Sequence, residues 1–125
     1  MARVLGIGGV FFKANDPSTL IDWYSEVLEI KMSAYGATFQ RDTLPEGSFT
    51  AFSIFNKTTE YFQPSQQEYL INFIVDDLDA LLKKIEANGG VLCGTPEEDE
   101  LGKFGWFLDP EGNKVELWQP NEHDS

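Results

Sequence analysis

A short turn sequence occurs twice in this chain, in the same local setting. Pro45-Glu46-Gly47 recurs 65 positions later as Pro110-Glu111-Gly112, and each copy stands between two apolar, strand-like runs. Further upstream, Asp16 matches Asp77 at an offset of 61, and a helical pattern follows each aspartate. Repetition of this kind indicates that one supersecondary unit was built twice and that the two copies pack together. The sequence therefore predicts two similar modules in one fold.

The length of the chain suits one domain in which both modules share a core. A chain of 125 residues can bury about two-thirds of the surface that its unfolded form exposes. A content of 42% apolar and 14% aromatic residues is typical of a globular protein. We expect a single domain over residues 1–125, with module one at 4–57, a linker at 58–67, module two at 68–120 and a tail at 121–125.

The charge of the chain disfavours two classes of partner. Nine basic residues against 21 acidic residues give a net charge of −12, which repels phosphate backbones and anionic lipid surfaces. We therefore expect no nucleic acid and no membrane as a partner. No apolar run approaches the ~18 residues that span a bilayer, and the first residues lack a signal-peptide pattern. The single cysteine, Cys93, fits a reducing compartment, so we expect a cytoplasmic protein.

Local patterns predict one helix and four strands in each module. Aspartate N-caps mark both helix starts, at Asp16 before Pro17 and at Asp77 before Leu78. In module one, apolar and β-branched runs predict strands at 4–14, 31–35, 37–42 and 48–55. In module two, similar runs predict strands at 69–75, 91–95, 103–108 and 113–119. Residues 97–100 are expected to form an inserted loop, which reconciles the two repeat offsets.

At this point the chain resembles the vicinal oxygen chelate superfamily, which includes glyoxalase I, bleomycin-resistance proteins and extradiol dioxygenases. The resemblance covers residues 4–120 and rests on three motifs in order: Asp16-Pro17 followed by Trp23-Tyr24 and Val27-Leu28, the run 73–79, and the run 109–118. It implies an α+β fold. Two tandem βαβββ modules would form a cupped, eight-stranded mixed sheet with the helices on the outside.

The resemblance also implies four equivalent metal-ligand positions, which the family fills with His, Glu or Gln. They map onto Gly9, Ala51, Leu70 and Glu116, of which only Glu116 has a side-chain donor. We therefore expect no cofactor and no divalent metal centre of the usual kind, although an atypical metal site that includes Glu116 stays open. The sole histidine, His123, lies in the predicted tail.

Strand alternation predicts the lining of the family's cleft, provided that Glu116 points into it. Lys114 and Trp118 then share the face of Glu116, whereas Val115 and Leu117 turn toward the helices. The alternation does not fix the face of Trp106. The ligand-binding residues that we expect are Phe11, Phe49, Ser53, Asn72, Trp106, Glu116 and Trp118. Aromatic walls with a few polar groups are typical of small-molecule pockets.

Three functions fit this sequence. The first is a small-molecule-binding protein similar to the bleomycin-resistance branch, in which an aromatic cleft on an acidic chain holds an aromatic or cationic compound. The second is a glyoxalase-like lyase or isomerase, with Glu116 as the tentative catalytic general base. The third is a non-catalytic dimer with a vestigial cleft. The resemblance implies a homodimer in each case.

Overall fold

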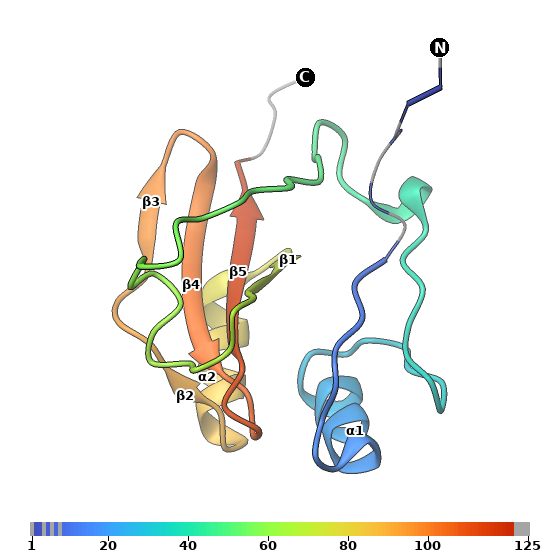
Figure 1. Ribbon diagram of the computed structural model, residues 1–125, viewed down its shortest axis with the longest axis vertical. Coiled ribbons are helices and arrows are strands. Elements are labelled where there is room, and N and C mark those ends of the chain that lie inside the picture. Colours follow the sequence, from blue (N-terminus) through green and yellow to red (C-terminus); the bar gives the residue numbers. More distant parts are fainter. Residues whose placement is uncertain (1, 4, 6, 8, 122–125) are drawn as a thin grey trace.

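The computed structural model describes residues 2, 3, 5, 7 and 9–121, which form two α-helices and one mixed sheet (Figure 1). The helices are α1 (Pro17–Val27) and α2 (Leu78–Ala87), and a short 3₁₀ helix, η1, spans Arg41–Thr43. The strands are β1 (Ile71–Ile74), β2 (Val91–Leu92), β3 (Glu97–Asp99), β4 (Gly102–Leu108) and β5 (Lys114–Pro120). The α+β class expected from the sequence is thus present, with five strands in the sheet.

The sheet is built entirely from module two. Its strand order is β1-β5-β4-β2, and β3 pairs with the other end of β4. β1 runs parallel to β5, and the remaining pairs are antiparallel. A parallel pair needs a crossover, and α2 is the first part of the connection from β1. The strands predicted at 69–75, 91–95, 103–108 and 113–119 are confirmed, with β1 and β2 shorter than predicted.

The expected loop at 97–100 was wrong, because residues 97–99 form β3. Glu97 pairs with Phe104 and Asp99 pairs with Gly102 across a tight turn. All three side chains of β3 are exposed. An exposed edge strand is held by its backbone pairing and therefore carries no alternation of apolar side chains that a sequence pattern could reveal.

Both helices begin in the same way, as the repeat predicts. The side chain of Asp16 accepts from the backbone N–H of Thr19 at 3.3 Å, and that of Asp77 accepts from Ala80 at 3.1 Å. The two caps also have similar backbone angles, with φ −131° and ψ 85° at Asp16 and φ −144° and ψ 89° at Asp77. Each carboxylate satisfies an N–H that has no partner within its helix.

The two Pro-Glu-Gly turns also share a backbone conformation. Gly47 has φ 83° and Gly112 has φ 82°, in the left-handed region that favours glycine. Among the described residues, only the second turn contacts another element through its glutamate: the carboxylate of Glu111 accepts from the backbone N–H of Asn15 at 2.6 Å and of Asp16 at 2.9 Å. The repeated turn in module two therefore holds the start of the helix in module one.

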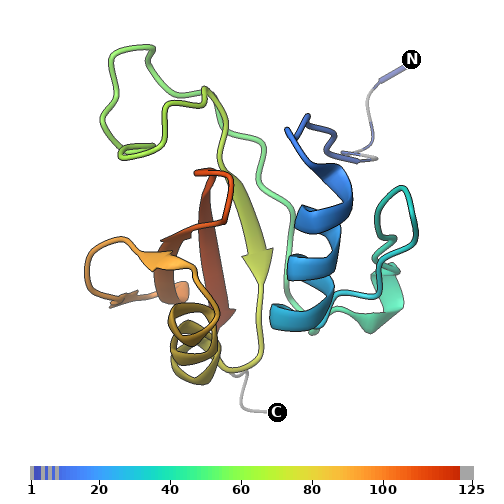
Figure 2. The ribbon, with the colours of Figure 1, turned by 90° about the horizontal axis from the view of Figure 1, so that it is seen from below.

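The core lies on one face of the sheet. It consists of buried apolar residues from both helices and both long strands: Leu20, Tyr24, Val27, Leu78, Leu82, Ile85, Phe107, Val115 and Leu117. Figure 2 shows α2 on this side of the sheet and a long loop on the other side. Val115 and Leu117 therefore turn toward the helices, as the alternation predicts. No helix among the described residues is long and apolar enough to cross a membrane.

Module one contains α1 and η1 but no strand within residues 9–57. The strands predicted at 31–35, 37–42 and 48–55 do not form, and neither does the described part of 4–14. A strand exists only through a paired neighbour, so β-branched and aromatic content does not suffice. In the structure, side chains of this module instead pack on module two, as Phe39 does near Phe73 and Phe49 does near Trp118. The eight-stranded sheet stays a prediction.

Candidate functional site

Glu116 lies at the centre of a polar group on the sheet face opposite the helices. On β5 it pairs in register with Asn72 of β1 on one side and with Trp106 of β4 on the other. Side chains that face each other in register point to the same side of a sheet. The fold thereby brings together three of the predicted site residues and fixes the face of Trp106, which the sequence left open.

The carboxylate of Glu116 accepts hydrogen bonds from three different elements. Asn72 Nδ2 donates to Oε1 at 2.6 Å, and Trp106 Nε1 donates to Oε2 at 2.7 Å. The hydroxyl of Tyr61 donates to the same Oε2. Hydrogen bonds to an ionised carboxylate are short and comparatively strong. The carboxylate is therefore fixed in position and direction before any ligand arrives.

Tyr61 comes from the segment predicted as a linker. In Figure 1 this segment, drawn in green, passes across β4 and β5 on its way to β1. Burial and the hydrogen bond to Glu116 raise the pKa of the Tyr61 hydroxyl, so it stays protonated and donates at neutral pH. The polar composition of residues 58–67 concealed this role. The adjacent aromatic pair Tyr61-Phe62 is the signal that could have revealed it.

A lysine brings a positive charge to the same group. Lys114, which is only 9% exposed, donates from Nζ to the carbonyl oxygen of Tyr61 at 2.6 Å. Its Nζ lies 5.0 Å from the ring centroid of Tyr61 and 6.0 Å from that of Trp106. These distances suit cation–π attraction. Lys114 shares the face of Glu116, as predicted, and fastens the crossing segment to the sheet.

Beyond this polar group the face is aromatic. The rings of Phe104 and Trp118, which are paired in register, are parallel to within 3° with centroids 6.2 Å apart. Phe49 packs on Trp118 at 5.1 Å between centroids. The indole N–H of Trp118 donates to the carbonyl of Leu101 at 2.7 Å, which fixes the ring. Sequence reasoning found Phe49 and Trp118 but missed Phe104, because the face of the segment 104–106 was undetermined.

Two other predicted ligand-binding residues lie apart from these contacts. The side chain of Phe11 is 94% exposed, and Ser53 is also exposed. Neither takes part in the hydrogen bonds that the structure describes around Glu116. Both belong to predicted strands of module one that do not form, so the alternation that placed them beside Glu116 does not apply.

Comparison with known proteins places this fold. The chain matches the model of the glyoxalase-like domain family over residues 9–118. The protein belongs to that family. This confirms the resemblance to the vicinal oxygen chelate superfamily. No curated protein matches the chain.

Solved structures similar to this glyoxalase-like domain share its fold at low identity. A member of the glyoxalase/bleomycin resistance protein/dioxygenase superfamily from Sphaerobacter thermophilus is 21% identical with a TM-score of 0.51, over 85% of this chain and 90% of that one. TnmS3, an antibiotic binding protein from Streptomyces sp. CB03234, is 22% identical with a TM-score of 0.52, over 86% and 88%. TioX from Micromonospora sp. ML1 is 13% identical with a TM-score of 0.51, over 90% and 94%.

The four family metal positions do not suit a divalent ion in this glyoxalase-like domain. Gly9, Ala51 and Leu70 have no side-chain donor, and the carboxylate of Glu116 is already held by three hydrogen bonds. Among the described residues, no three His, Cys, Asp or Glu side chains gather closely enough to hold a metal. His123 lies outside the described residues. A divalent ion needs several convergent donors, which this set of positions does not supply.

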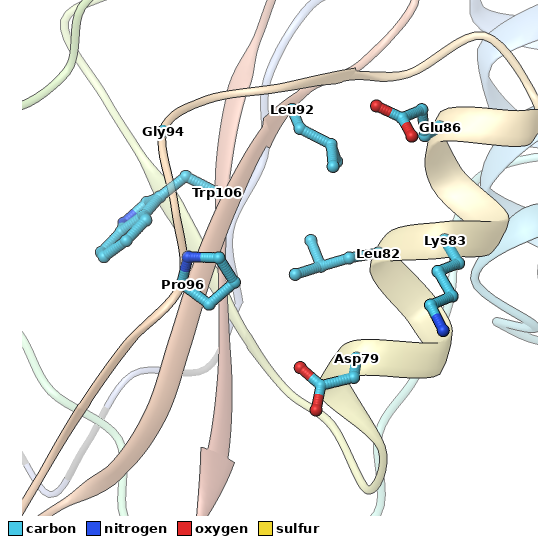
Figure 3. Close-up of a pocket in the computed structure, with 8 residues that line it drawn as sticks. All are labelled: Asp79, Leu82, Lys83, Glu86, Leu92, Gly94, Pro96 and Trp106. Carbon is cyan, nitrogen blue, oxygen red and sulfur yellow. The ribbon is translucent and has the colours of Figure 1, made fainter.

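A hollow lies on the helix side of the sheet, at its β2 edge (Figure 3). Its volume is about 350 Å³, and it lies between α2 and the segment that leads from β2 to β3. Leu82, Leu92 and Pro96 form its apolar part, and charged side chains of α2 stand at its rim. In Figure 3 the ring of Trp106 points away from Leu82. Trp106 nevertheless lines the hollow, so the hollow and the Glu116 group share this residue.

Proposed function

We propose that this glyoxalase-like domain binds a small aromatic molecule on the sheet face that carries Glu116, and that it does so without the usual divalent metal centre. The observation that carries the proposal is the fixed carboxylate among aromatic rings. Glu116 is oriented by Asn72, Trp106 and Tyr61, the rings of Tyr61 and Trp106 stand beside it, and Trp118 lies on the same face of β5. Small-molecule sites combine apolar walls with a few oriented polar groups in this way.

Partly exposed rings supply the contact surface for such a ligand. Phe49, Phe55 and Tyr61 each keep about half of their surface open to solvent. Phe55, which precedes the crossing segment in sequence, stacks on Tyr61 of that segment with centroids 5.6 Å apart. An aromatic ligand would cover these rings and gain the free energy of burying apolar surface. The similarity in fold to an antibiotic binding protein, TnmS3, supports the same class of function.

A thermal-shift screen tests this proposal. The purified protein is treated with a chelator and screened against a library of aromatic compounds, with and without added divalent ions. We expect compounds that raise the melting temperature equally in both conditions, because binding to the native state stabilises it. Stabilisation only in the presence of a divalent ion would overturn the metal-free proposal, and a library without any stabilising compound would overturn ligand binding.

A matched pair of variants locates the site. Glu116→Ala removes the anchor carboxylate, whereas Glu46→Ala removes an exposed carboxylate from the first Pro-Glu-Gly turn, away from β5. Both changes alter the net charge equally. We expect Glu116→Ala to abolish stabilisation by the hits and Glu46→Ala to leave it unchanged. Equal effects of the two variants would place the ligand elsewhere.

An enzymatic role for Glu116 is the second candidate, and one observation favours it. Among the described residues only Asn72 donates a hydrogen bond to Oε1, so one acceptor position on this oxygen stays open to a substrate. A glyoxalase-like lyase or isomerase would use it as a general base beside a carbonyl. Any turnover found should disappear in Glu116→Gln. An undiminished rate in that variant would remove this mechanism.

The homodimer implied by the family belongs to the same proposal. Size-exclusion chromatography with light scattering should give twice the chain mass of 14.1 kDa. A stable dimer that binds no compound of the library would instead favour a non-catalytic protein with a vestigial site. A monomer that binds a ligand would contradict the homodimer but not the ligand-binding proposal.

A further inference from the structure

We propose that Lys114 occupies, from within the protein, the place that a ligand's positive charge would take, so that the site selects neutral aromatic molecules over cationic ones. This inference rests on the proposed function and specifies its ligand. The net charge of −12 would by itself favour a cationic ligand. The arrangement of Lys114, Tyr61 and Trp106 argues for the opposite preference at the site.

The two rings nearest Glu116 already have a cation. Lys114 Nζ lies 5.0 Å from the ring centroid of Tyr61 and 6.0 Å from that of Trp106. The two rings are nearly perpendicular, at 89°, with centroids 6.3 Å apart, so one ammonium group can interact with both. A cation near an aromatic face is attracted to the electron-rich centre of the ring. A cationic ligand would have to interact with rings that already interact with the ammonium group of Lys114.

Burial and hydrogen bonding hold Lys114 in this place. Its side chain is 9% exposed, and its Nζ donates to the carbonyl of Tyr61 at 2.6 Å. Withdrawing the ammonium would leave this carbonyl without its partner and break the contact with both rings. A cationic ligand that stacks on Tyr61 or Trp106 therefore approaches a fixed like charge, since Lys114 Nζ lies 5.0 Å and 6.0 Å from the centroids of these rings.

The anchor carboxylate suits a neutral ligand that donates a hydrogen bond. Within the part of the chain that the structure describes, Oε2 of Glu116 accepts from both Tyr61 and Trp106, whereas Oε1 accepts only from Asn72. A carboxylate oxygen has two acceptor positions, so Oε1 keeps one. The ligand class is thus a neutral aromatic molecule with a hydroxyl or N–H at its edge, of which a naphthol is a simple example.

A pair of probes with the same shape and different charge tests this selection. 1-Methylnaphthalene is neutral, and N-methylquinolinium replaces one ring carbon with a cationic nitrogen. Dissociation constants are measured in chelator by following the indole N–H signal of Trp106 in NMR spectra. For the wild-type protein we expect the neutral probe to bind at least about tenfold more tightly, given unit charges a few ångströms apart. Equal or tighter binding of the cation would overturn the inference.

Two lysine variants separate the local effect from the general hydrophobicity of the neutral probe. Lys114→Met keeps the length of the side chain and removes its charge. Lys103→Met removes the same charge from the helix side of the sheet, where Lys103 pairs with Asp79 at 3.6 Å. The preference for the neutral probe should fall about tenfold or more in Lys114→Met and stay unchanged in Lys103→Met. An equal change in both variants would assign the effect to net charge and overturn the inference.

A second pair of probes, 1-naphthol and naphthalene, tests the open acceptor position on Oε1. This comparison uses only the wild-type protein. 1-Naphthol should bind more tightly than naphthalene, by about tenfold for one hydrogen bond to a carboxylate. Equal affinities would refute the donor requirement. If none of the four probes binds, the proposed function fails together with this inference. If the cation is preferred, only the inference fails.

Discussion

The hydroxyl of Tyr24 on α1 donates to Asp109 Oδ2, at the end of β4, at 2.8 Å across 85 positions of sequence. Both side chains are buried. Asp109 also accepts from the backbone N–H of Glu111 at 2.9 Å and from the side chain of Asn113 at 2.9 Å. One carboxylate therefore shapes the second Pro-Glu-Gly turn and binds the helix of the other module. The repeated turn is a joint between the modules as well as a connection between strands.

Removal of the Tyr24 hydroxyl should weaken this joint. In Tyr24→Phe the ring stays in the core, but the buried carboxylate of Asp109 loses a donor, so we expect a loss of about 1–3 kcal/mol in the free energy of unfolding. Urea denaturation followed by circular dichroism measures it. Tyr35→Phe is the matched control, because Tyr35 is 99% exposed and should change stability by less than about 0.5 kcal/mol. Equal effects of the two variants would contradict a stabilising role of the hydrogen bond between Tyr24 and Asp109.

The two glutamates of the repeated turn should differ in their contribution to stability. Glu111→Ala leaves the backbone N–H groups of Asn15 and Asp16 without their carboxylate, so we expect a loss of about 1 kcal/mol. Glu46→Ala, at the equivalent place in module one, removes an exposed side chain and should be nearly neutral. Chemical denaturation of the two variants at neutral pH makes the comparison. A larger loss in Glu46→Ala would contradict the structure of module one.

Stability should fall at alkaline pH because three tyrosines resist ionisation in the folded chain. Burial raises the pKa of Tyr24, Tyr61 and Tyr69 above the ordinary value of 10.0. A raised pKa in the folded state stabilises the fold fully below pH 10.0, and this stabilisation is lost as the pH rises through the folded-state values. The free energy of unfolding should therefore decrease progressively as the pH rises above about 10. The decrease should be smaller in Tyr24→Phe, and an unchanged slope in that variant would contradict the assignment.

Residue patterns predicted module two closely and module one only in part. Aspartates at 16 and 77 located both helix starts, because an N-cap acts through local hydrogen bonds that a sequence shows directly. Alternation along β5 gave the correct faces for Val115 and Glu116, because one side of that strand is buried. Strand pairing in module one depends on neighbours that are distant in sequence, and local composition does not specify them.

The candidate site likewise contains residues that the sequence predicted and residues that it missed. Asn72 and Glu116 were predicted from alternation, and the register of β1 and β5 brings them within 2.6 Å of each other. Tyr61 was missed because no periodic pattern links a polar connecting segment to a sheet face. Its position results from tertiary contacts with Glu116 and Lys114, which are more than 50 positions away.

Loss of the Tyr61 hydroxyl should disturb the anchor more than the fold. Tyr61→Phe keeps the ring beside Lys114 and Phe55 but removes one donor to Glu116 Oε2, where the indole N–H of Trp106 remains. We expect a stability loss of about 1 kcal/mol, since the group is partly exposed, and a several-fold weaker affinity for hits of the thermal-shift screen. Urea denaturation and calorimetric titration measure the two effects. Unchanged affinity would show that Tyr61 does not orient the anchor.

The three tryptophans allow the most direct test of ligand binding on the Glu116 face. The indole N–H of Trp106 donates to Glu116, that of Trp118 to Leu101, and that of Trp23 on α1 to Asn88 at 2.8 Å. Each gives its own signal in a ¹H–¹⁵N NMR spectrum of the chelator-treated protein, titrated with a hit compound. We predict that the signals of Trp106 and Trp118 move in proportion to bound ligand while that of Trp23 stays. A shift confined to Trp23, or shifts that appear only after a divalent ion is added, would contradict metal-free binding at Glu116.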